Sequence, residues 1–196
     1  MKDQLIKSIQ QSFEKSIQLI ISICESEIEK IFILKLINYV LKRPDRYNLG
    51  FLLLETETKI VGGKEVTTSE VNFQMPDGFG YLCGLRINNL ISQTFIDIFP
   101  QHKETFIKGG KMLQTINYRL DFAVFKYSIL NPKQILKKYC IECDGYDFHS
   151  SKDQIKSDNN RIRDLLLRHD YTTMRYLGTE IYNWEESEIG LFIWNL

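Results

Sequence analysis

The chain has 196 residues, enough for one well-packed domain and too few for two of ordinary size. Hydrophobic residues make up 43% of it and charged residues 26%, which are ordinary proportions for a globular protein. Lys plus Arg and Asp plus Glu each number 25, so the net charge argues neither for nor against a nucleic-acid partner. Any basic surface must come from local clustering.

No stretch reaches the roughly 18 apolar residues that a membrane-spanning helix needs, and the first residues do not form a secretory signal. Four cysteines are too few for a disulfide scaffold and fit a reducing compartment. We therefore expect a soluble, cytoplasmic protein without a membrane partner. Positions three apart on a strand face opposite sides, which argues against shared zinc binding by Cys140 and Cys143. Both are therefore expected to be buried small apolar residues.

The first third of the chain is expected to be helical. Apolar residues recur at helical spacing from Leu5 to Ile20 and again from Ile28 to Val40. Pro44 stops the second pattern. The spacing does not distinguish two helices from one bent helix.

From about Leu49 the chain is rich in short runs of aromatic and β-branched residues separated by Gly and Pro, which predicts strands joined by turns. The clearest runs are 51–54, 71–73, 94–99, 120–125 and 138–144. The last two are separated by Asn131-Pro132 and are expected to form a hairpin-like pair.

A helix is expected over about 151–169, a strand over 171–177 and a closing helix from about Trp184. Helices first, strands in the middle and a strand between helices at the end indicate a mixed α/β (α+β) fold. With no internal repeat or linker, we expect one domain over residues 1–196.

Three acidic residues on the paired strands are the sharpest chemical feature of the sequence. Because side chains alternate along a strand, Asp121 is expected on the face opposite to Leu120 and Phe122. By the same rule, Glu142 and Asp144 share one face of the following strand. Carboxylates in an apolar setting are costly and repel one another, so a cation between them is favoured.

Oxygen ligands of this kind suit Mg²⁺ or Mn²⁺, and such an ion can activate water for attack on a phosphate. A plainer interpretation is that the acids cap strand ends or pair with Arg119, Lys137 and Lys138. Spacing alone does not decide between the two. His102 and His169 show no partner pattern and are expected to be ordinary surface residues.

The segments 118–124 and 141–145, followed by His149 and by Asp158-Asn159-Asn160-Arg161, resemble the PD-(D/E)xK nucleases. The nearest subgroup is that of the very-short-patch-repair-like endonucleases. Pro100-Gln101, Ser26-Glu27-Ile28-Glu29 and the tail 171–181 are also similar to elements of that family. The resemblance runs from about Ser26 to the end, but it is specific only over 118–181.

This resemblance implies a restriction-endonuclease-like core, a central mixed β-sheet flanked by helices. Residues 50–99 match nothing in the family and are expected to be a β-rich insertion. The resemblance further implies that Asp121, Glu142 and Glu29 bind Mg²⁺ or Mn²⁺, with the backbone carbonyl of Cys143 as another ligand. Glu29 has a competing role, because Ser26 and Glu29 also form the pattern of a helix capping box.

The sequence departs from the superfamily at Asp144, where a lysine is usual. The missing cation must then come from elsewhere, with Arg161 the first candidate and Lys152 another. Asp144 or His149 is expected to orient the attacking water or to carry a proton. Gln101, Lys156 and Arg161 are the residues expected to contact nucleic acid.

The expected activity is metal-dependent hydrolysis of phosphodiester bonds, with DNA favoured over RNA. The main alternative is a catalytically inactive nucleic-acid-binding or assembly subunit of the same fold, and a third is a structural domain with incidental acids. A homodimer or a larger complex stays open, and residues 50–99 are candidates for a dimer contact.

Overall fold

The computed structural model describes residues 2–53, 55–61, 64–70, 83–108, 114–145 and 152–196. In chain order its elements are α1 (Lys2–Ile23), α2 (Glu27–Leu41), β1 (Tyr47–Leu53), β2 (Glu55–Val61), β3 (Lys64–Glu70), β4 (Cys83–Asn89), β5 (Thr94–Lys108), β6 (Gln114–Ser128), β7 (Ile135–Asp144), α3 (Lys152–His169), β8 (Tyr171–Leu177), α4 (Gly178–Asn183) and α5 (Glu186–Asn195).

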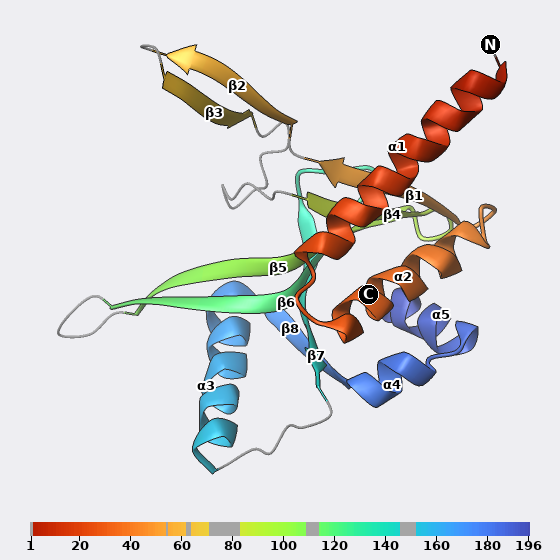
Figure 1. Ribbon diagram of the computed structural model, residues 1–196. Coiled ribbons are helices and arrows are strands. Elements are labelled where there is room, and N and C mark those ends of the chain that lie inside the picture. Colours follow the sequence, from red (N-terminus) through yellow and green to blue (C-terminus); the bar gives the residue numbers. More distant parts are fainter. Residues whose placement is uncertain (1, 54, 62–63, 71–82, 109–113, 146–151) are drawn as a thin grey trace.

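A six-stranded mixed sheet in the order β1-β4-β5-β6-β7-β8 forms the centre of the molecule. All neighbouring strands are antiparallel except β7 and β8, which are parallel. Strands β2 and β3 form a separate two-stranded sheet at the top of Figure 1. The expectation of an α+β fold with a mixed sheet flanked by helices is confirmed.

Helices cover both faces of the sheet. On one face, residues of α1, α2 and α5 share a buried core with strand residues such as Ile98 and Phe122. On the other face, Leu165 of α3 packs in a second core that includes Phe125 and Tyr171. Figure 1 shows α3 standing apart from α2, α4 and α5. No helix in the described ranges is long and apolar enough to span a membrane.

The N-terminal third consists of two helices, which settles the question that the spacing left open. Ser26 caps the second helix by accepting a hydrogen bond from the backbone N–H of Glu29 at 3.2 Å. At the other end of the chain, the expected closing helix from about Trp184 is α5, which begins at Glu186, and a further short helix, α4, precedes it.

The predicted pairing of the 120–125 and 138–144 strands is confirmed, although both strands are longer. The 94–99 strand likewise continues to Lys108. The run 71–73 lies outside the described residues. Within the segment expected to be an insertion, β1, β4 and the start of β5 belong to the main sheet, and only β2 and β3 stand apart from it.

The position of the acidic residues follows from a fork between β6 and β7. Their pairing covers Phe122 to Tyr127 of β6 and ends at the Phe122–Ile141 pair. Before Phe122, β6 pairs with β5 as a two-stranded ribbon that projects past α3 (Figure 1). Beyond Ile141, β7 continues along β8 as far as Asp144. Asp121 and Glu142 therefore lie where the two strands separate.

One detail of the predicted face pattern is wrong. Phe122 packs in the α1–α2–α5 core and Ala123 in the α3 core, as alternation requires. Leu120, however, packs with Ala123 in the α3 core instead of with Phe122. The alternation fails because the β5–β6 ribbon turns away from the sheet here, next to Gln101, whose φ is 53°.

Candidate functional site

Asp121 lies at the fork and caps the end of the β6–β7 ladder. Its Oδ2 accepts a hydrogen bond from the backbone N–H of Cys143 at 2.8 Å, just beyond the last strand pair. Burial raises the pKa of Asp121, this N–H lowers it, and the nearby charge of Glu29 raises it further; the net direction is upward. The strand-end capping that the plainer interpretation proposed is therefore present at Asp121.

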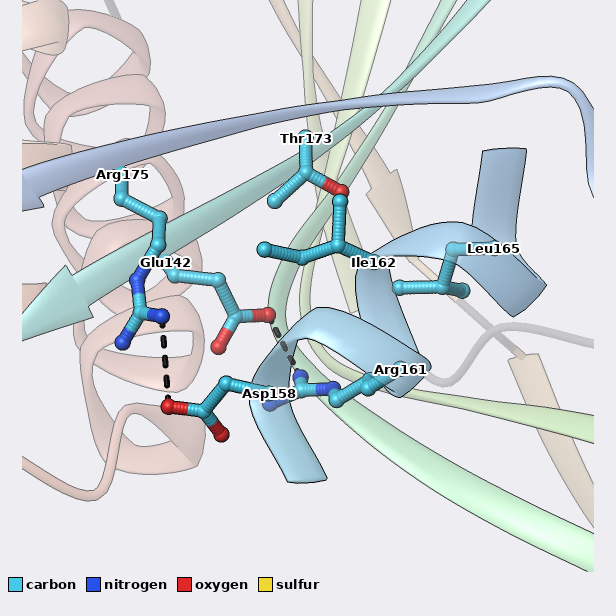
Figure 2. Close-up of a pocket in the computed structure, with 7 residues that line it drawn as sticks. All are labelled: Glu142, Asp158, Arg161, Ile162, Leu165, Thr173 and Arg175. Atoms are coloured by element: carbon cyan, nitrogen blue, oxygen red, sulfur yellow. Dashed lines mark hydrogen bonds and ion pairs between the residues drawn. The ribbon is translucent and has the colours of Figure 1, made fainter. Parts of the chain in front are cut away.

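Glu142 is buried, with 9% of its surface exposed, and it points from β7 toward α3 (Figure 2). Its Oε1 accepts hydrogen bonds from Arg161 Nη2 at 2.6 Å and from Cys140 Sγ at 2.9 Å. Burial raises the pKa of Glu142 to about 7; Arg161 lowers it and the neighbouring Asp121 raises it. Glu142 is thus a carboxylate whose ionised form is destabilised by its surroundings.

Arg161 joins α3 to both arms of the fork. Besides Glu142 on β7, its Nη2 donates to the backbone carbonyl of Arg119 on β6 at 2.6 Å. The residue is partly buried, and its guanidinium carbon lies 5.9 Å from the centre of the Tyr118 ring. Arg161, the first candidate for the missing cation, therefore does lie at the acidic cluster, paired with a carboxylate.

Asp144 is bound by an arginine that no motif of the sequence singled out. Arg175 of β8 binds both oxygens of Asp144, with its Nε and Nη2 each at 2.9 Å. It also reaches Asp158 of α3 at 3.3 Å (Figure 2). The contact with Asp144 raises the pKa of Arg175. The cation beside Asp144 thus comes from the neighbouring parallel strand and was not among the expected candidates.

A small hollow separates the two arginines on the α3 side of the sheet. The residues that line it are Glu142, Asp158, Arg161, Ile162, Leu165, Thr173 and Arg175 (Figure 2). The Thr173 hydroxyl is buried and, within the described residues, has no hydrogen-bond partner. Glu142 is the residue of this hollow that also belongs to the fork.

Glu29 lies on the other side of the fork, at the start of α2, and is buried, with 4% exposed. Its carboxylate accepts three hydrogen bonds, from the Ser26 hydroxyl at 2.8 Å, the Glu25 backbone N–H at 2.9 Å and Gln101 Nε2 at 2.7 Å. The capping-box prediction is confirmed in part: Ser26 caps the Glu29 N–H, but Glu29 accepts the backbone N–H of Glu25 instead of that of Ser26. These donors satisfy the charge of Glu29 without a cation, and metal binding by Glu29 stays a prediction.

Gln101 was expected to contact nucleic acid, but the contact that the structure describes is with Glu29. Its amide oxygen is buried and meets no hydrogen-bond partner in the described part of the chain. Next to this pair, Glu25 forms an ion pair with Arg119 at 2.7 Å. Together these contacts tie the start of α2 to the β5–β6 ribbon at the fork.

The remaining predicted site residues lie on or before α3. Lys156 is exposed on that helix. His149 lies outside the described residues, and so does the side chain of Lys152. The cysteine prediction is confirmed, since Cys140 and Cys143 are free, buried and in the two opposite cores.

The expectation that His102 and His169 are surface residues is wrong. Both lie beside the buried Glu104, with nitrogen–oxygen distances of 3.7 Å for His102 and 3.5 Å for His169. His102 has 5% of its surface exposed, and the side chain of His169 has 27%. A buried carboxylate needs hydrogen-bonding or charged partners, and Glu104 has one histidine two residues away on its own strand and one from the end of α3 beside it.

Within the described residues, no three His, Cys, Asp or Glu side chains are arranged as a group that could hold a metal ion. A site built on two carboxylates is compatible with that finding. Asp121 raises the pKa of Glu142, and the charges of Glu29 and Asp144 raise the pKa of Asp121, a condition that a cation between the acids would relieve. Their oxygens are the ligand type that Mg²⁺ prefers, and Mg²⁺ is often bound by one or two protein carboxylates and several waters.

Comparison with known proteins adds no family. No protein-family model matches the chain, and neither a curated protein nor a solved structure shows a significant match.

Proposed function

We propose that this protein is a metal-dependent nuclease of the PD-(D/E)xK type and that its sheet is a restriction-endonuclease-like core. The observation that carries the proposal is the pair Asp121 and Glu142 at the fork between β6 and β7. The two acids come from adjacent strands, Glu142 is buried and Asp121 is partly buried. Asp121 raises the pKa of Glu142, and Glu29 and Asp144 raise the pKa of Asp121. Such strongly shifted groups are typical of functional sites.

Asp121 and Glu142 would hold one Mg²⁺ or Mn²⁺ ion, with the backbone carbonyl of Cys143 as a further ligand. An ion at this position would activate water and neutralise charge that develops on a phosphate. Arg161, on the adjacent face of α3, would bind a phosphate oxygen, since its guanidinium presents several donors in a fixed plane.

Asp144 would not act alone in this arrangement. Its two oxygens are bound by Arg175, so the side chain is held in one orientation at the end of β7. We propose that the Asp144–Arg175 pair orients the attacking water and adds positive charge where the superfamily has its lysine. DNA is the favoured substrate, and RNA is the comparison to be made.

The test is cleavage of plasmid DNA, single-stranded DNA and RNA with Mg²⁺ or Mn²⁺ present. We expect wild-type protein to cleave and Asp121→Asn and Glu142→Gln to lose at least about a hundredfold in rate, because each removes a ligand charge. Two exposed acids supply matched controls, Asp45→Asn and Glu14→Gln, which should keep wild-type rates.

Equal rates for wild type and the two site variants would contradict the proposal, because cleavage would then come from another site or a contaminant. Absence of cleavage by wild type on all three substrates would contradict it as well.

One observation favours a second candidate, an inactive nucleic-acid-binding or assembly subunit. Arginines already neutralise both Glu142 and Asp144 through short ion pairs. A subunit of this kind would bind nucleic acid in a gel-shift measurement without cleaving it, and its binding would not change on Asp121→Asn substitution.

A further inference from the structure

Arg161 is bound to the Glu142 carboxylate, the group that the proposed metal ion would share with Asp121. The Oε1 of Glu142 accepts Arg161 Nη2 at 2.6 Å and also the thiol of Cys140 at 2.9 Å. The same Nη2 donates to the Arg119 carbonyl across the fork. The guanidinium therefore lies between the two strands, on the charge that the acidic cluster would offer to a divalent cation.

From this geometry we infer that Arg161 and a divalent cation compete for Glu142, and that the metal-free protein is closed by this ion pair. The inference rests on the proposed function. Two cations within a few ångströms repel strongly at a partly buried site, so an ion at Glu142 excludes the guanidinium from its present position. Metal binding and the Arg161–Glu142 contact are therefore mutually exclusive states.

A neighbouring aromatic ring can hold the side chain once it leaves Glu142. Arg161 has 26% of its side chain exposed, and the Tyr118 ring lies 5.9 Å from its guanidinium carbon. Tyr118 is fixed in turn by a hydrogen bond from its hydroxyl to Asp164 at 3.2 Å. A guanidinium that leaves Glu142 can stay over this ring by a cation–π contact, at the outer side of the fork, where a phosphate would approach.

The competition makes Arg161 a residue that controls access of the ion as well as one that binds phosphate. Without metal, the ion pair keeps Glu142 from holding an uncompensated charge. With metal, the same guanidinium is released to a substrate phosphate. The cost of breaking the ion pair weakens metal affinity in the absence of nucleic acid.

The test measures Mn²⁺ binding to the full chain by calorimetry, in the absence of nucleic acid. We expect Arg161→Gln to bind Mn²⁺ roughly tenfold more tightly than wild type, because the competing cation is gone. Arg163→Gln is the matched control: Arg163 is exposed on the same helix and donates a hydrogen bond to Asn160, so its variant should bind like wild type. Glu142→Gln should lose binding.

A second measurement uses wild-type protein, so it does not depend on whether a variant folds. In Mg²⁺ titrations of wild-type protein followed by NMR, the side-chain nitrogen signal of Arg161 should shift as the ion binds, and that of Arg163 should not. A signal that stays unchanged at saturation overturns the competition.

The outcomes separate the two proposals. If Arg161→Gln binds Mn²⁺ no more tightly than wild type while Glu142→Gln binds it more weakly, the competition is overturned and the proposed metal site is still supported. No Mn²⁺ binding by wild type or Arg161→Gln at millimolar concentrations overturns the competition and the metal-dependent nuclease together.

Discussion

At the scale of single residues, Glu142 occupies a position where its ionised form lowers the stability of the fold. The side chain is 11% exposed and lies beside a second acid, Asp121. Arg161 and the Cys140 thiol offset only part of that cost, because the pKa of Glu142 still rises to about 7. A residue kept in so unfavourable a setting is better explained by a function than by packing.

Glu142→Gln should therefore stabilise the metal-free protein at alkaline pH. The folded pKa of about 7 lies above the ordinary 4.5, so ionised Glu142 destabilises the fold above pH 7, and this loss is relieved as pH falls toward 4.5. Denaturant unfolding should show a gain on the order of 3 kcal/mol at pH 8 that shrinks toward zero near pH 4.5.

Glu14→Gln on exposed α1 serves as the control and should change little at either pH. A Glu142→Gln protein that is less stable than wild type at pH 8 would show that the Arg161 ion pair outweighs the cost of burial.

At the scale of elements, close contact between a strand and its neighbours sets the sheet's geometry. Gly84 of β4 lies against the Phe99 ring, and a Cβ placed there would come within 2.6 Å of two ring atoms. Phe99 is buried in the α3 core, with 3% exposed. The Phe99 side chain of β5 thus fills the space beside Gly84 on the neighbouring strand, and only glycine fits at this position unless the ring shifts.

Gly84→Ala should destabilise the protein by about 1–3 kcal/mol, because the buried ring must move. Gly50→Ala in the neighbouring strand β1 is the matched control, since its Cβ would lie 3.7 Å from the nearest atom, an ordinary contact. We expect that change to be neutral or to stabilise by roughly 0.5–1 kcal/mol, as Ala replaces Gly within a strand. Thermal unfolding of the two variants gives the comparison, and equal effects would refute the steric explanation.

At the scale of the whole molecule, a buried carboxylate joins elements from both halves of the chain. Glu104 of β5 meets His102 on the same strand and His169 at the end of α3. Burial raises the pKa of Glu104, but His102, His169 and Tyr171 outweigh it, so the net direction is downward. Burial lowers the pKa of His169 from its ordinary 6.5, and Glu104 offsets part of that shift.

This cluster should make the fold sensitive to acid. The unfolded chain takes up the His169 proton at a higher pH than the folded one, so the contribution of His169 is present above pH 6.5 and is lost as pH falls through the lowered folded pKa. The stability difference between wild type and His169→Gln should therefore narrow between pH 7.5 and pH 5.5 in denaturant titrations. A difference that widens on acidification would contradict the direction of the shift.

Local patterns account for much of what the sequence predicted. The helices, the 120–125 and 138–144 strand pair and the Ser26 N-cap of α2 depend on neighbours within a few residues. Alternation also placed Cys140 and Cys143 in opposite cores. It failed at Leu120, because a strand that leaves the sheet no longer has the sheet's two faces to alternate between.

Contacts between distant segments were beyond such patterns. Nothing in the 171–177 run shows that it pairs in parallel with β7, yet this pairing sets Arg175 opposite Glu142 and lets it bind Asp144. The contact of His169 with Glu104 was missed for the same reason, since His169 comes from the far end of α3.

By itself, the sequence determined the α+β class, the order of most elements and the presence of Asp121, Glu142 and Asp144 on two paired strands, because these depend on short-range periodicity. Only the tertiary structure decided which cations meet the acids: Arg161 at Glu142 and Arg175 at Asp144. The physical reason is that an ion pair forms between side chains that the sheet and α3 bring together, and spacing along the chain does not encode that meeting.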